Sequence, residues 1–173
     1  MQKILHGGQK LTKDFRPTSA KVLQALFNIL GDVRGDRFLD LFSGSGQVAL
    51  TAAGKGADIC LVESDRKNFG DILKKVTPEI RCVNMDVRRA IPKLLRENAE
   101  FDIIFADPPY MLGWGTEFPK LMDKNVKLLA EDGVIIFEHS EREKADFGEQ
   151  WETENRAYGG TILTFAKRRK NNA

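Results

Sequence analysis

The 173-residue sequence lacks long hydrophobic runs and has few cysteines. No apolar stretch approaches the roughly 20 residues that a membrane-spanning helix needs, and the first residues, MQKILHGGQK, lack the hydrophobic block of a secretory signal. We therefore expect a cytoplasmic protein without a membrane partner. The 2 cysteines, Cys60 and Cys82, lie inside apolar segments without CxxC spacing. This pattern predicts reduced core thiols and no metal site.

The chain also lacks an excess of one charge, because 27 basic residues face 25 acidic ones. Its length suits one packed domain, residues 1–173, and is too short for two. Positive charge nevertheless collects at both ends, which predicts a basic arm at residues 1–15 and a basic tail at residues 167–173. Such ends either face nucleic-acid phosphates or are solvated tails that aid solubility, and the sequence leaves both interpretations open.

Short apolar runs alternate with helical patterns along the chain, which is typical of a parallel α/β sheet. The runs are continuous rather than alternating, so each predicts a strand buried on both faces; they cover residues 37–42, 58–63, 80–85, 101–106 and 133–139. Apolar residues at helical spacing predict crossover helices at residues 49–56, 66–76, 87–97 and 117–130. Right-handed crossovers then give a doubly wound sheet.

Both ends of this pattern carry further elements. A helix is expected after Thr18 or Ser19, either of which suits its N-cap, and it should end at Gly31. Residues 151–168 have no helical pattern, and Gly159-Gly160 separates two β-prone runs there. They predict a closing antiparallel hairpin. The expected fold is an α/β, mostly parallel, seven-stranded sheet that ends in this hairpin.

A glycine-rich turn, LFSGSGQVAL, follows the first predicted strand and opens a helix. Gly44, Gly46 and Ala49 fit the G-x-G-x-x-A pattern, in which backbone N–H groups approach a nucleotide closely. Glu63 ends the second strand, where an acid can bind both hydroxyls of a ribose. This pattern alone accommodates NAD or any other nucleoside cofactor.

Asp40 narrows the choice of cofactor. It ends the first strand, beside the position that the pyrophosphate of a dinucleotide would take, and two like charges in a partly dry cleft repel each other. S-adenosylmethionine carries a sulfonium and an ammonium group instead, so Asp40 favours that cofactor. Asp86 follows the third strand and suits either the adenine amino group or the N-cap of the next helix, and Val87 offers a backbone N–H.

The sequence DPPY, Asp107 to Tyr110, follows the fourth strand at the expected ligand-binding edge of the sheet. Pro108 and Pro109 have a fixed φ and no N–H, so the loop is stiff and offers only acceptors to a ligand. The Asp107 carboxyl and the Pro108 carbonyl could then each accept one N–H of a nucleobase amine and aim its lone pair at a methyl group.

Tyr110 is placed to stack on a base that has left its helix or loop. The alternative, purely structural interpretation of DPPY is a turn that ends a strand. Trp114, which lies between two glycines, either contacts the substrate or folds back on the core.

With these residues in place, the sequence resembles the RsmD-like family of bacterial 16S rRNA guanine-N2 methyltransferases. The resemblance rests on Gly7-Gly8, on Arg16-Pro17-Thr18, on DLFSGSG, on Glu63 and on DPPY. It implies a Rossmann-like class I methyltransferase fold, the cofactor S-adenosylmethionine, and methyl transfer to a guanine N2 amine of 16S rRNA, as naked RNA or in a small-subunit particle. It implies a monomer and no DNA partner. The arm carries fewer arginines than is usual in the family.

The resemblance also implies a set of site residues. The catalytic ones are Asp107, Pro108, Pro109 and Tyr110, and the cofactor-binding ones are Thr18, Asp40, Phe42, Ser43, Gly44, Ser45, Gly46, Glu63, Asp86 and Val87.

Three alternative functions follow from parts of the pattern. The glycine loop or DPPY taken singly resembles DNA adenine methyltransferases equally well, so a DNA adenine-N6 or cytosine-N4 methyltransferase is the nearest alternative. The sequence has no separate target-recognition domain, which disfavours it. An NAD-dependent oxidoreductase would use the glycine loop but would leave Asp40 and DPPY unexplained. An inactive RNA-binding module of the same fold would bind RNA without the cofactor.

Overall fold

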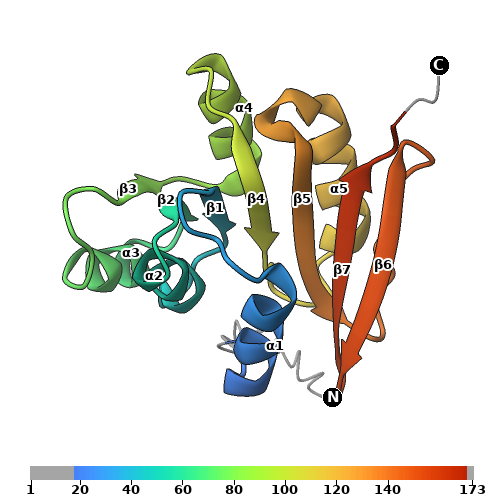
Figure 1. The fold of residues 1–173 in the computed structure, drawn as a ribbon, viewed down its shortest axis with the longest axis horizontal. Coiled ribbons are helices and arrows are strands. Elements are labelled where there is room, and N and C mark those ends of the chain that lie inside the picture. The colour runs from blue at the N-terminus through green and yellow to red at the C-terminus, as the bar shows by residue number, and fades with distance from the viewer. Residues whose placement is uncertain (1–17, 171–173) are drawn as a thin grey trace, which may run out of the picture.

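In the computed structural model, which describes residues 18–170, the chain forms one sheet with helices on both faces (Figure 1). The predicted arm, residues 1–15, lies outside the described residues. The elements in chain order are α1 (Ala20–Leu30), β1 (Arg37–Leu41), α2 (Gln47–Gly54), β2 (Asp58–Glu63), α3 (Arg66–Leu73), β3 (Arg81–Asn84), α4 (Val87–Arg96), β4 (Phe101–Ala106), α5 (Trp114–Lys124), the 3-10 helix η1 (Val126–Leu128), β5 (Leu129–Ser140), β6 (Trp151–Tyr158) and β7 (Thr161–Arg168).

The strand order is β3-β2-β1-β4-β5-β7-β6. β1 to β5 pair in parallel, while β7 pairs antiparallel with both β5 and β6. The order reverses between β1 and β4, which is where a doubly wound sheet binds its ligand. The predicted seven-stranded, mostly parallel sheet with a closing hairpin is confirmed.

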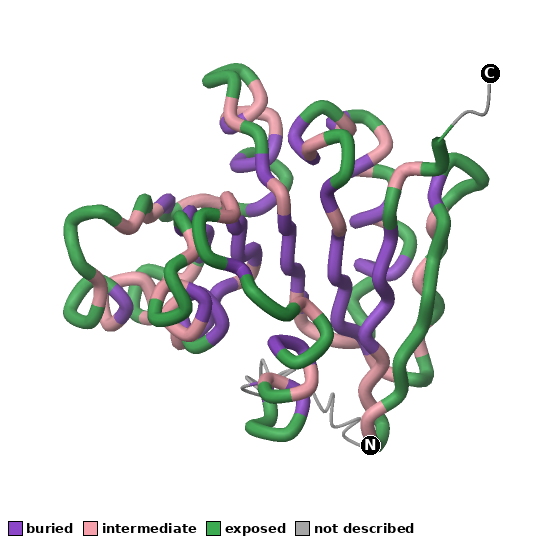
Figure 2. The backbone as a smooth tube through the Cα atoms, in the orientation of Figure 1, coloured by how far each residue is buried: buried purple, intermediate pink, exposed green. Residues whose placement is uncertain are grey.

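Two apolar cores, one on each face, hold the helices to the sheet. α4 and α5 cover one face through side chains such as Ile91 and Phe118. α1, α2 and α3 cover the other through side chains such as Leu26 and Ile72. The central strands are therefore buried on both sides, as their continuous apolar sequences predict, while the edge strand β6 is exposed along most of its length (Figure 2).

The helix α1 starts as the sequence predicts. Ser19 is the N-cap, with its Oγ accepting the Val22 N–H at 3.2 Å, and Gly31 ends the helix. Thr18, the other candidate cap, is buried just before the helix. Because Ser19 is the N-cap, the Thr18 side chain is not needed there and faces the carboxyl edge of the sheet, where it contacts Asp107.

The helix predicted at residues 117–130 is partly wrong. α5 begins at Trp114 and ends at Lys124, and β5 begins at Leu129, earlier than the expected residue 133. Leu129 pairs with Phe101 of β4, and the register shifts before Ile103 pairs with Val134. Pairing with a neighbouring strand, which local periodicity cannot show, decides the structure of this segment.

The predicted basic tail begins inside the sheet. Lys167 and Arg168 are the last residues of β7, and the Arg168 guanidinium donates to the carbonyl of Leu129. Lys170 forms an exposed ion pair with Asp132 at 2.8 Å. Among residues 18–170, no helix has the length and apolar character needed to cross a membrane.

The backbone of α5 touches the segment after β5 at Gly115. A Cβ at this position would lie 2.2 Å from the Lys144 carbonyl oxygen, and the Gly115 carbonyl accepts the Asp146 N–H at 2.9 Å. We expect Gly115→Ala to lower the free energy of unfolding by about 1 to 3 kcal/mol, because main-chain atoms have to move apart. Urea unfolding measures this change.

Gly70 of α3 is the matched control. A Cβ there meets nothing within 4 Å. Gly70→Ala should leave stability unchanged or raise it by up to about 1 kcal/mol, because alanine favours a helix. Equal effects of the two substitutions would contradict the close approach at Gly115.

Candidate active site

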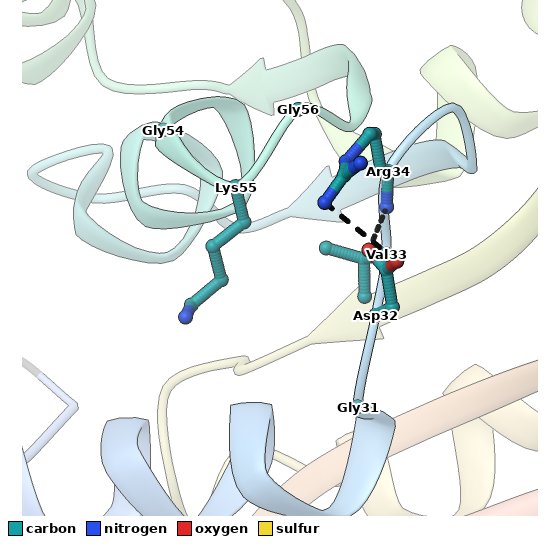
Figure 3. A pocket seen from close by; sticks show the side chains of 7 residues that line it. All are labelled: Gly31, Asp32, Val33, Arg34, Gly54, Lys55 and Gly56. Atoms are coloured by element: carbon teal, nitrogen blue, oxygen red, sulfur yellow. Dashed lines mark hydrogen bonds and ion pairs between the residues drawn. The ribbon is translucent and has the colours of Figure 1, made fainter.

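The predicted site residues gather around one cavity at the carboxyl ends of the parallel strands. Its volume is about 1140 Å³, and every predicted catalytic and cofactor-binding residue lines it except Gly46. A smaller groove, of about 480 Å³, lies before β1 and β2, at the other edge of the sheet. None of the predicted site residues lines this groove. The Arg34 N–H donates a hydrogen bond to the Asp32 carboxyl there, and the Lys55 side chain points away from both residues (Figure 3).

Gly46 of the glycine loop does not line the cavity and packs against Ile72 instead. Gly46 is the N-cap of α2 with φ 77°, and a Cβ on it would lie 3.2 Å from Cγ1 of Ile72. Gly44 and Phe42 also have positive φ, 57° and 60°. Left-handed backbone at a residue such as Phe42 is strained and is found mainly at functional sites. The positive φ angles thus let the loop backbone approach a ligand closely, and Gly46 allows the loop to pack against α3.

Asp40 is buried at the end of β1, with a relative exposure of 1%. Its Oδ2 accepts the Ala49 N–H of α2 at 3.1 Å. Burial raises the pKa of Asp40 to about 7; hydrogen bonds from Ala49 and Ser43 oppose this shift, and the Glu63 charge adds to it. A buried carboxyl that lines a cavity suits a cationic ligand.

Glu63, at the end of β2, holds the glycine loop. Its Oε2 accepts the Gly44 N–H at 2.6 Å, and its Oε1 accepts the Asp65 N–H at 2.7 Å. Each carboxylate oxygen has a second lone pair, so these bonds leave capacity for ribose hydroxyls. Binding of the ribose by Glu63 stays a prediction.

Asp86 is the N-cap of α4, which confirms one of its two interpretations. Its Oδ1 accepts the Arg88 N–H at 2.9 Å. The side chain is exposed and lines the cavity together with Val87. Its contact with an adenine stays a prediction.

Asp107 lies at the end of β4, beside β1, with part of its surface open to the cavity. Thr18 Oγ1 lies 3.3 Å from its Oδ2. Burial raises the pKa of Asp107 well above its ordinary value, and the charges of Glu138 and Asp40 raise it further. Thr18, predicted to bind the cofactor, therefore contacts Asp107, a predicted catalytic residue.

Glu138 is a buried acid that contacts two of the cavity-lining residues, and the sequence analysis missed it. It lies in β5 with a relative exposure of 4%. Its Oε2 is 3.4 Å from Thr18 Oγ1, and its Oε1 accepts the Tyr110 hydroxyl at 3.3 Å. Burial raises its pKa as well. An acid inside the apolar run GVIIFEH was the available signal, because a buried charge requires partners.

Trp114 and Tyr110 are two of the aromatic residues that line the cavity. Trp114 is buried as the first residue of α5, and its ring lies edge-on to Phe42, with centroids 4.7 Å apart. The Arg88 guanidinium lies 4.1 Å from its centroid. Trp114 thus folds into the core, which confirms one of its two interpretations. It also lines the cavity, and its contact with a substrate stays a prediction. Tyr110 is anchored by its hydroxyl, and stacking of its ring on a base stays a prediction.

Comparison with known proteins agrees with this geometry. Residues 7–167 match the family model described as "Conserved hypothetical protein 95". The chain is 30% identical over 144 residues to ribosomal RNA small subunit methyltransferase D of Buchnera aphidicola subsp. Acyrthosiphon pisum, covering 80% of this chain and 74% of that protein. It is 31% identical over 129 residues to the protein of the same name from Escherichia coli K12, covering 71% and 60%.

Among solved structures, a hypothetical protein of Thermus thermophilus superposes with a TM-score of 0.75 at 27% identity, covering 91% of each chain. The sheet order, the glycine loop after β1 and the match over nearly the whole chain lead to one conclusion. The chain belongs to the RsmD-like family of rRNA methyltransferases and has the class I S-adenosylmethionine-dependent methyltransferase fold.

Proposed function

We propose that this protein transfers a methyl group from S-adenosylmethionine to the exocyclic N2 amine of a guanine in 16S rRNA. The observation that carries this proposal is that Asp107, at the end of β4, opens into the same cavity as Asp40 and the glycine loop of β1. The cofactor follows from the family and the fold. Guanine as the base, its N2 amine as the acceptor and 16S rRNA as the substrate rest on the chemistry of this cavity and on the family resemblance.

The residues present fit the cofactor. When bound, S-adenosylmethionine supplies an electrophilic methyl group attached to a sulfonium. Asp40 lines the cavity beside the glycine loop, where its carboxyl would stabilise positive charge. Glu63 holds the loop in place and keeps lone pairs for a ribose, while Asp86 and the Val87 N–H suit an adenine edge.

The DPPY loop is suited to bind an amine. Asp107 and the carbonyl of Pro108 accept hydrogen bonds, and neither proline has an N–H that would repel the amine hydrogens. Two accepted hydrogen bonds would hold the nitrogen with its lone pair facing the methyl donor. The loop therefore contributes orientation and stabilisation of the charge that develops on nitrogen.

The mouth of the cavity is suited to RNA that has lost its stacking. Met111 and Leu112 follow Tyr110 and are exposed, at 67% and 54%, and both line the cavity. Apolar side chains beside a recessed site can contact the bases that flank an extruded one, while Tyr110 stacks on the extruded base itself. The proposed partner is accordingly 16S rRNA or a small-subunit particle, bound by a monomer.

The product decides between this proposal and methylation of DNA. Purified protein should transfer label from S-adenosylmethionine to 16S rRNA or small subunits that lack the modification, and nucleoside analysis should find N2-methylguanosine. Double-stranded DNA is the control substrate. Label on adenine or cytosine of DNA, or none on any ribosomal RNA, would refute the proposal.

Asp107 should be needed for transfer and not for cofactor binding. We expect Asp107→Ala to lower the single-turnover rate by at least about a hundredfold, because an amine acceptor is lost. Cofactor affinity should stay within about threefold of the wild type, because Asp107 serves the amine. Quench-flow and calorimetric titration measure the two quantities. Loss of cofactor binding would contradict this division of roles.

Asp40 should lower the stability of the cofactor-free protein. A buried carboxyl whose pKa rises to about 7 keeps a proton that the unfolded chain releases near pH 4. Stability therefore falls as the pH rises from about 4 to about 7. At about pH 8, Asp40→Asn should unfold with about 1 to 3 kcal/mol more free energy than the wild type, because no charge is buried. Its cofactor affinity should fall at least about tenfold.

Urea unfolding and calorimetric titration measure both effects of Asp40→Asn. Asp58→Asn, on an exposed residue of β2, is the control and should change neither quantity. A variant that binds the cofactor as tightly as the wild type would show that the Asp40 charge has no part in binding.

A further inference from the structure

Four side chains from distant parts of the chain form a hydrogen-bonded group beside the cavity. Thr18 precedes α1, Asp107 and Tyr110 follow β4, and Glu138 lies in β5. The Thr18 hydroxyl is 3.3 Å from Asp107 Oδ2 and 3.4 Å from Glu138 Oε2. The Tyr110 hydroxyl is 3.3 Å from Glu138 Oε1 and 3.3 Å from the Thr161 hydroxyl. The Thr18 hydroxyl thus joins two carboxyls, of which Glu138 is buried and Asp107 is partly open to the cavity.

If both carboxyls were ionised, the Thr18 hydroxyl could donate a hydrogen bond to only one of them. Thr18 has a single hydroxyl hydrogen, so it donates to one carboxyl at a time. No ion pair joins Asp107 or Glu138 to a cation of residues 18–170. One added proton completes the group, because a protonated carboxyl then donates to Thr18 Oγ1, which donates to the other carboxylate.

The hydrogen-bond partners determine which carboxyl keeps that proton. Glu138 faces two donors, the hydroxyls of Thr18 and Tyr110, whereas Asp107 has only Thr18 among the described residues. Asp40, when it is ionised, adds a negative charge on the side of Asp107. A negative charge is more stable where it accepts more hydrogen bonds and has fewer like charges nearby, so it belongs on Glu138.

Within residues 18–170, the groups recorded next to Glu138 come from three parts of the fold. Its titratable neighbours are Asp107 and Tyr110 from the loop after β4. The segment before α1 contributes Thr18, and β7 contributes its cross-strand partner Leu163 and, through Tyr110, Thr161. Burial raises the pKa of both carboxyls, and the Tyr110 and Thr18 hydrogen bonds oppose that rise at Glu138.

We propose that Glu138 carries the negative charge of this group, and that Asp107 acts as a neutral acid held in position by Glu138 through Thr18. Asp107 Oδ2 then donates to Thr18, and Oδ1 is free to accept an N–H of the substrate amine. Glu138 is a positioning residue, since it acts on the amine only through Thr18, Asp107 and Tyr110. The amine in this inference rests on the proposed function, whereas the placement of the proton does not.

A pair of isosteric amides tests the placement. Asp107→Asn keeps an acceptor oxygen for the amine and an N–H donor for Thr18, so it imitates a neutral Asp107. It should transfer methyl groups at least about tenfold faster than Asp107→Ala. Glu138→Gln removes the charge and should slow transfer at saturating cofactor and RNA by at least about tenfold. The reverse ranking, with Glu138→Gln near wild type and Asp107→Asn as slow as Asp107→Ala, would overturn the proposal.

The pH dependence separates a charged role of Glu138 from a purely structural one. The wild-type single-turnover rate should rise with pH as Glu138 ionises, at a higher pH than an ordinary glutamate requires. Asp107→Asn should keep this rise, and Glu138→Gln should lose it. A rise that persists unchanged in Glu138→Gln would contradict the proposal.

Carbon NMR of the wild-type protein tests the placement without substrate or cofactor. Aspartate and glutamate carboxyl carbons are labelled in separate samples, and the Asp107 signal is identified by its loss in Asp107→Asn. The aspartate signal should remain that of a protonated acid at a pH where every glutamate is ionised. Ionisation of Asp107 below Glu138 would overturn the inference, whereas a wild-type protein that methylates no RNA would refute the proposed function alone. The titration still decides if Glu138→Gln fails to fold.

Discussion

The parallel pairing of β1 with β4 is the constraint on which the site depends. Asp40 pairs with Phe105 and Leu41 with Ala106, so the two strands end side by side at the centre of the sheet. Their outgoing loops carry the glycine turn and DPPY. Because the strand order reverses here, the helices that follow β1 and β4 pack on opposite faces and leave the loop ends open to a ligand.

That arrangement concentrates acidic side chains at one place. Asp40, Glu63 and Asp107 line the cavity, and Glu138 is hydrogen-bonded to Thr18 and Tyr110, which also line it. They are stabilised by backbone N–H groups and hydroxyls rather than by ion pairs within residues 18–170. Such an acidic cavity lowers the stability of the empty protein and favours a cationic ligand, so stability and function are in tension here.

Most of the fold was predictable, because the signals are local and strong. Continuous apolar strands indicated a sheet covered on both faces, and Gly159-Gly160 marked the closing hairpin. The segment from residue 117 to 130 was not predictable in the same way. Its apolar spacing suits a helix, yet Leu129 pairs with Phe101, a residue distant in sequence. The start of α5 at Trp114 was not predictable either. Gly113 is the N-cap of this helix, and the residues around Trp114 show no apolar spacing that indicates a helix.

The sequence by itself determined the chemistry at each strand end: a glycine turn with an acid before it, an acid after β2, and an acid followed by two prolines and a tyrosine. These features are local, since a proline fixes its own φ wherever it lies. The tertiary structure alone decided that Thr18 meets Asp107 and Glu138, because these two residues lie 89 and 120 positions after it along the chain. A shared proton depends on distances of a few ångströms between side chains, and only the packing of α1 and β5 against the end of β4 sets those distances.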